Sequence, residues 1–175
     1  SNAVGRHQVD ITGLIGQYAH GNEPSHHMAY LYNYINKPWK SQERIAQILS
    51  EMYSNTPDGL SGNEDCGQMS SWYVLSAMGI YSVTPGLDYY TIGSPRLNKA
   101  IINLENGNQF KIIAHGASKE NIYIKSALLN GESFNRSYIY HSEIMNGGIL
   151  EFEMSPEPNK LWASLDSNLP ISSVD

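Results

Sequence analysis

The chain has 175 residues, which is enough for one domain or one and a half. Its apolar fraction of 41% is that of a globular protein and argues against a disordered or fibrous chain. The formal net charge is −6 and the basic residues are scattered, so no basic patch is available to neutralise the phosphates of a nucleic acid. No apolar run reaches the length of a membrane span, and the single cysteine, Cys66, cannot form an internal disulfide.

The first residues suggest a piece cut from a longer protein. Ser1-Asn2-Ala3 is typical of the remnant of an expression tag, and residues 4–14 open without a methionine or a helix cap. We therefore leave residues 1–3 out of the fold prediction and expect the parent protein to extend upstream of residue 4.

Residues 4–84 are predicted to form a helical segment. Residues 7–17 contain two glycines, so a helix there is an open question. Pro24 fits the first turn of a helix that runs to about Tyr34. Ser41 can cap the next and clearest helix. The apolar residues of that helix follow a one-face spacing: Ile45, Ile48, Leu49 and Met52.

A third helix is predicted from Cys66 to Met78, after a polar, glycine-rich loop over residues 55–67. Unpaired N–H groups and the dipole favour a carboxylate at a helix start, so Asp65 can simply cap this helix. A chemical role for Asp65 remains the alternative. Trp72 can stack on a sugar ring or belong to the core, and its apolar neighbours favour the core.

Residues 85–175 are predicted to form an antiparallel β region. Short β-prone runs alternate there with turn signals such as Asn130-Gly131, a dipeptide typical of hairpins. The last run alternates as a strand with one buried face does, through Leu150, Phe152 and Met154. Because helices precede strands along the chain, the predicted fold class is α+β, with a boundary near Pro85.

Possible ligand groups also gather between His20 and His27. Adjacent histidines on a helix point about 100 degrees apart, so His26 and His27 are a poor pair for one zinc ion unless a third ligand lies nearby. Asn22 and Glu23 are hard oxygen donors of the kind that calcium takes. Two such residues are weak evidence by themselves, and an ordinary polar loop remains the alternative.

Two long motifs carry a likeness to a known family. The first is His20-Gly21-Asn22-Glu23-Pro24-Ser25-His26-His27, followed by Tyr30-Leu31-Tyr32-Asn33-Tyr34 and Pro38-Trp39. The second is Asp58-Gly59-Leu60 with Gly62-Asn63-Glu64-Asp65-Cys66-Gly67-Gln68-Met69-Ser70. With these motifs the chain resembles the family 92 glycoside hydrolases, which are calcium-dependent exo-acting α-mannosidases. The likeness continues to Gly147-Gly148 and so covers nearly the whole chain.

The resemblance implies an architecture. Full members combine an N-terminal β-sandwich with an (α/α)6 barrel, and this chain would supply the C-terminal helices of the barrel, followed by the antiparallel β region. The upstream half of the same polypeptide would then be its partner. A partial barrel leaves apolar faces unburied, so self-association of the fragment is also expected. The resemblance further implies a periplasmic, cell-surface or secreted location and an α-mannoside or N-glycan substrate.

The resemblance also implies a mechanism. Family members are inverting enzymes, which need a general acid and a general base on opposite faces of the sugar ring. The base falls at Asp65, and Asn63, an aspartate in some members, falls at an assisting position. The general acid lies upstream of this chain, so we expect the isolated chain to be inactive.

The remaining matches imply binding roles. Asn22 and Glu23 are implied as calcium or sugar contacts, and His20 and Gln68, on weaker matches, as sugar contacts. Calcium is the implied cofactor. Two other hypotheses stay open: a carbohydrate- or calcium-binding module without chemistry, and a structural domain whose polar loops only cap helices.

Overall fold

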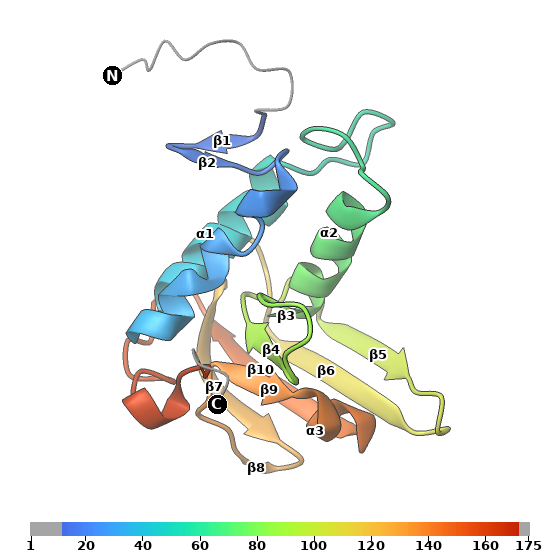
Figure 1. Ribbon diagram of the computed structural model, residues 1–175. Helices are drawn as coiled ribbons and strands as arrows, with labels where there is room; N and C mark the ends of the chain where they lie inside the picture. The colour runs from blue at the N-terminus through green and yellow to red at the C-terminus, as the bar shows by residue number, and fades with distance from the viewer. Residues whose placement is uncertain (1–11, 172–175) are drawn as a thin grey trace.

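The computed structural model describes residues 12–171, so the predicted tag remnant and the start of the predicted helical segment lie outside the described residues. Helices and short hairpins occupy the first part of this range, and strands occupy the rest (Figure 1). The prediction of a mixed helix and strand content is confirmed. An (α/α)6 barrel cannot be recognised from the helices of residues 12–171, so that detail stays a prediction.

The N-terminal part begins with a small hairpin and continues with helices. Its elements are β1 (Leu14–Ile15), β2 (Tyr18–Ala19), the 3-10 helices η1 (Glu23–Ser25) and η2 (Met28–Ile35), α1 (Pro38–Glu51) and α2 (Gln68–Met78). Whether residues 7–17 form a helix is therefore answered for the described part, where Leu14–Ile15 form a strand. The helix predicted to run to about Tyr34 is present as two 3-10 helices, a tighter form that suits short pieces.

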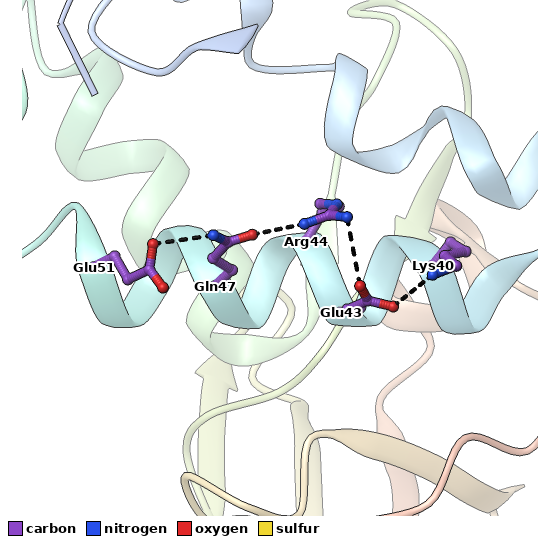
Figure 2. A network of polar contacts seen from close by, with 5 residues as sticks. All are labelled: Lys40, Glu43, Arg44, Gln47 and Glu51. Atoms are coloured by element: carbon purple, nitrogen blue, oxygen red, sulfur yellow. Dashed lines mark hydrogen bonds and ion pairs between the residues drawn. The ribbon is translucent and has the colours of Figure 1, made fainter. Parts of the chain in front are cut away.

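Helix α1 starts earlier than its predicted cap. Pro38 occupies the first turn, where its fixed φ and missing N–H fit a helix start. Ser41 lies inside the helix and is fully buried, so its predicted role as a cap is wrong. Figure 2 shows the polar side of α1, where ion pairs and hydrogen bonds link Lys40, Glu43, Arg44, Gln47 and Glu51 along the helix.

The strands form two sheets besides the β1–β2 hairpin. A five-stranded sheet has the order β5-β6-β10-β7-β8, and a three-stranded sheet has the order β3-β4-β9. Their bounds are β3 (Ile80–Tyr81), β4 (Tyr89–Ile92), β5 (Lys99–Asn103), β6 (Gln109–His115), β7 (Tyr123–Leu129), β8 (Glu132–Ser133), β9 (Tyr138–Tyr140) and β10 (Gly148–Ser155). The short helices α3 (His141–Met145) and η3 (Asp166–Asn168) lie among the later connections.

The larger sheet is mixed rather than purely antiparallel. Strand β10 runs parallel to β6, with Gly148 opposite Phe110, and antiparallel to β7. The antiparallel prediction is wrong for this one pairing, because the chain returns through β7, β8, β9 and α3 before β10 joins β6. The Asn130-Gly131 hairpin is confirmed between β7 and β8, with φ values of 52° and 85°. Strand β3 precedes the predicted boundary at Pro85.

Two apolar clusters hold the elements together. One lies under the large sheet and includes the predicted alternating residues of β10: Leu150, Phe152 and Met154. The other joins α1, α2 and η2 around Trp72 and Tyr30. Gln42 of α1 bridges them, since its Oε1 accepts the backbone N–H of Ile124 in β7 at 3.1 Å. Within residues 12–171, no helix combines the length and the apolar character that crossing a membrane requires.

Candidate functional site

The two polar motifs lie far apart in sequence and side by side in space. The first occupies the turn from β2 into η1, and the second occupies the loop that leads into α2. Their backbones approach closely at two glycines. A Cβ at Gly21 would lie 2.4 Å from the carbonyl oxygen of Ser61, and a Cβ at Gly62 would lie 2.9 Å from the Cα of Gly21. Only glycine fits such an approach, so these glycines bring the motifs together.

Asp65 is exposed on an unusual turn. Its φ is 44°, and the next two residues, Cys66 and Gly67, have φ values of 57° and 87°. Left-handed backbone in non-glycine residues is costly and gathers at functional sites. Helix α2 is preceded by Gly67 and has no side-chain cap, so the capping alternative for Asp65 is wrong. Glu64 serves the helix start instead, because its carboxylate accepts the N–H of Ser70 at 3.0 Å and the Ser70 hydroxyl at 2.8 Å.

The carboxyl groups of Asp65 and Glu23 meet across the two loops. The pKa of Asp65 is raised above its ordinary value. The largest cause is a hydrogen bond with Glu23, and the second is charge repulsion from the same residue. The Oε1 atom of Glu23 is buried and has no hydrogen-bond partner among residues 12–171. This oxygen is therefore an unused hydrogen-bond acceptor beside the Asp65 carboxyl.

His20, in the same motif as Glu23, lies in a cluster of aromatic rings. Its ring is fully buried, stacks on His26 at 4.7 Å and meets Trp72 edge-on at 4.5 Å. Its Nδ1 lies 2.7 Å from the Tyr18 hydroxyl, and its Nε2 lies 2.6 Å from the Tyr53 hydroxyl. Burial, with repulsion from His26, lowers the pKa of His20 to about 3, so the ring is neutral. Both nitrogens are already engaged within the protein.

Gln68 and His26 connect the cluster to the site loops. The Gln68 amide nitrogen lies 3.2 Å from Nδ1 of His26 and 3.3 Å from the Tyr81 hydroxyl. Trp72 is buried, as its apolar neighbours predict, and donates its indole N–H to the carbonyl of His26 at 3.1 Å. The core prediction for Trp72 is confirmed.

The comparison with known families decides what this arrangement belongs to. Residues 2–156 match the glycosyl hydrolase family 92 catalytic domain. The chain belongs to this family.

Solved structures agree with the family assignment. A family 92 α-mannosidase from Bacteroides thetaiotaomicron, in complex with mannoimidazole, is 45% identical, with a TM-score of 0.91 over 94% of this chain and 22% of its own. A family 92 inverting mannosidase from the same bacterium is 43% identical, with a TM-score of 0.85 over 90% of this chain and 21% of its own. An uncharacterized secreted glycosidase of Arthroderma benhamiae is 31% identical over 155 residues, which are 87% of this chain and 20% of that protein. The family 92 chain thus spans about a fifth of the length of these relatives.

The calcium implied by the family resemblance can be tested against the residues present. No group of three His, Cys, Asp or Glu side chains within residues 12–171 is arranged to hold a metal ion. Glu23 still offers a buried, unpartnered carboxylate oxygen, and Asn22 beside it is exposed. Calcium takes six to eight oxygen ligands, including amides, waters and ligand hydroxyls, so these two residues fit as part of a site.

The structure assembles most of the predicted site residues and adds others. Asp65 lies next to Glu23, and Gln68 is hydrogen-bonded to His26, whereas Asn63 is exposed in the same loop as Asp65. Sequence patterns missed the tyrosines around His20 and Gln68: Tyr18, Tyr53 and Tyr81. Tyrosine is common in cores, so spacing along the chain carries no signal for these contacts.

Proposed function

We propose that this chain is the base-bearing part of an inverting, calcium-dependent exo-α-mannosidase. The observation that carries the proposal is the turn at Asp65. In a chain of this family, it presents an exposed carboxylate on left-handed backbone, next to a second carboxylate, Glu23, from the other motif.

Asp65 acts in this proposal as the general base. In its ionised form it takes a proton from the water that attacks the sugar carbon, on the face opposite the leaving group. In the metal-free chain the neighbouring Glu23 raises the pKa of Asp65, and a base with a higher pKa accepts a proton more readily. Asn63 orients the water through its amide, which cannot itself take a proton. A general acid from the upstream half protonates the leaving oxygen, since one carboxylate cannot act on both faces at once.

Asn22 and Glu23 would hold calcium together with ligands from outside this chain. When bound there, calcium would supply a positive charge that attracts the hydroxyl oxygens of mannose and would favour distortion of the ring. The unpartnered Glu23 oxygen supports this assignment. His20 and Gln68 remain predicted sugar contacts, although the side-chain nitrogens of both are engaged within the protein.

The proposed substrate is a terminal α-1,2-linked mannose on an α-mannoside or an N-glycan. The solved relatives named as α-mannosidases support the sugar, and the relative named as a secreted glycosidase supports a location outside the cytoplasm, in the periplasm, on the cell surface or in the medium. The short span relative to these proteins supports an upstream half as partner. The isolated chain is then inactive.

The test uses the parent polypeptide with its upstream half and measures mannose release from an α-1,2-linked mannobiose. Asp65→Asn should lower kcat by about a thousandfold, the scale seen when an essential proton-transfer group is lost. Asp58→Asn, in the same loop and also exposed, is the matched control and should keep wild-type turnover. Full activity of Asp65→Asn would refute the proposal. A chelator should stop turnover if calcium is the cofactor.

A second candidate is a binding module without chemistry. The unpartnered Glu23 oxygen is compatible with it, because a cation site needs no general acid. This candidate predicts that the isolated chain binds mannose only with calcium, as calorimetry would detect, and that the parent with Asp65→Asn behaves like wild type.

A further inference from the structure

A second pair of side chains links the same two loops as the Asp65–Glu23 pair. His26 follows Glu23 by three residues, and Gln68 follows Asp65 by three residues. These two followers are themselves bonded, with the Gln68 amide nitrogen 3.2 Å from His26 Nδ1. The two loops of the site are therefore in contact at two places, at the carboxylates and at the Gln68–His26 hydrogen bond three residues further along each loop.

The partners of His26 define the direction of this bond. Its Nε2 lies 2.9 Å from the backbone carbonyl of His20, and a carbonyl can only accept, so Nε2 carries the ring hydrogen. In a neutral ring with its hydrogen on Nε2, Nδ1 is an acceptor, and burial lowers the pKa of His26, which favours that neutral form. The Gln68 amide N–H therefore donates to Nδ1, and the side chain of Gln68 is oriented by that requirement.

Both ends of the link are anchored. The residue His26 is 1% exposed. Its backbone N–H donates to the backbone carbonyl of Glu23 at 2.9 Å, and its backbone carbonyl accepts the indole N–H of Trp72. Gln68 is the first residue of α2 and follows directly on the left-handed turn that carries Asp65. Loss of this hydrogen bond therefore affects both carboxylates through short segments of backbone, residues 23–26 and 65–68.

We propose that the Gln68–His26 hydrogen bond is a positioning link that fixes Asp65 relative to Glu23. This inference rests on the proposed function. It makes Gln68 and His26 positioning residues that act through the loops, and for Gln68 it replaces the predicted sugar contact with this role. A misplacement of a catalytic group by about 1 Å can cost on the order of a hundredfold in rate, so a bond outside the reacting atoms can matter for turnover.

The experiment measures kcat and KM for mannose release by the parent polypeptide with its upstream half. Gln68→Met keeps the length of the side chain and removes the donor, and His26→Phe keeps a ring and removes the acceptor. Each should lower kcat by about 10- to 100-fold and leave KM within about twofold, because the link acts only on the position of the base. The double variant should be no slower than the slower single variant.

A conservative variant separates positioning from folding. His26→Asn places an amide oxygen near the position of Nδ1 and should recover most of the lost kcat, whereas a defect in folding alone would follow the melting temperature of each variant. Independent losses that multiply in the double variant would overturn the inference. So would a raised KM in Gln68→Met alone, which would give Gln68 a direct contact with the sugar.

The control for the proposed function is Asp65→Asn in the same parent. If Asp65→Asn is inactive while Gln68→Met and His26→Phe keep wild-type kcat, only the positioning link is overturned. If Asp65→Asn keeps full turnover, the proposed base is wrong, and the positioning role fails with it.

Discussion

At the scale of single residues, the site depends on groups whose charge or size is fixed by their surroundings. Gly21 and Gly62 allow two loops to approach, and this approach sets the Asp65 carboxyl against Glu23. Below them His20 is neutral because it is buried and because both of its nitrogens face tyrosine hydroxyls. The Asp65 carboxylate is exposed, one oxygen of Glu23 is buried, and the rings of His20, His26 and Trp72 pack against one another.

His20 should make the stability of the fold depend on pH. Its pKa is about 3 when folded and near 6.5 when unfolded, so between these values the unfolded chain binds a proton that the folded chain does not. Stability therefore falls as pH drops below about 6.5, by up to about 1.4 kcal/mol per pH unit for this one group. Denaturant unfolding between pH 4 and 7 measures the slope. His20→Phe should flatten it, and an unchanged slope would contradict the assignment.

Gly21→Ala tests the close approach of the loops. The added methyl would meet the Ser61 carbonyl oxygen at 2.4 Å, so one loop must move, at a cost of about 1–3 kcal/mol. Gly131→Ala is the control, because its Cβ meets nothing within 4 Å and only its φ of 85° opposes the change, at about 1 kcal/mol. Thermal unfolding compares the two variants. An equal loss in both would mean that the approach at Gly21 is loose.

At the scale of elements, α1 and α2 are held by different means at their starts. Pro38 begins α1 without a side-chain cap, while Glu64 reaches forward to Ser70 in the first turn of α2. The partly exposed network along α1 in Figure 2 consists of pairs three or four residues apart and the adjacent pair Glu43–Arg44. Pairs three or four residues apart contribute a few tenths of a kcal/mol each. Most of the stability of α1 comes instead from its buried face, which includes Ile45 and Ile48.

Ser41→Ala separates the sequence prediction for α1 from the structure. Loss of a cap would cost about 1 kcal/mol. The structure instead buries the Ser41 hydroxyl with no hydrogen-bond partner among residues 12–171, so removing it should leave stability unchanged or raise it by about 1 kcal/mol. Urea unfolding decides between the two. A loss of about 1 kcal/mol in Ser41→Ala would contradict the structural interpretation and indicate that the hydroxyl makes a stabilising hydrogen bond.

At the scale of the whole molecule, the helical side leaves apolar groups uncovered. Met28, Leu31 and Ile35 of η2 are 43%, 42% and 54% exposed, and Tyr73 and Val74 of α2 are exposed as well. The relatives are about four times as long, so in a parent of similar size further chain is available to cover these groups. Exposed apolar groups of this kind favour association.

We predict that the isolated chain self-associates as its concentration rises, and that the parent with its upstream half does not. Sedimentation velocity over a concentration series measures this. Leu31→Glu should weaken the association, because a charge placed in an apolar contact loses its hydration. Glu51→Gln, on the polar face of α1, is the matched control. A strictly monomeric chain at all concentrations would rule out self-association.

The sequence by itself determined the family, the order of helices before strands, the end of α2 at Met78, the hairpin at Asn130-Gly131 and the buried face of β10. These are local patterns of a few residues, or long motifs, so the chain order alone contains them. It also indicated which loops bear polar groups, but the role of Asp65 as a cap or a base stayed open.

Only the tertiary structure decided how distant residues combine. The parallel pairing of β10 with β6, the contact of Asp65 with Glu23 and the bond between Gln68 and His26 each join segments that no local pattern relates. Their physical reason is packing: a close approach at Gly21 and Gly62, and a shared aromatic core around Trp72, fix the loops once the helices are in place.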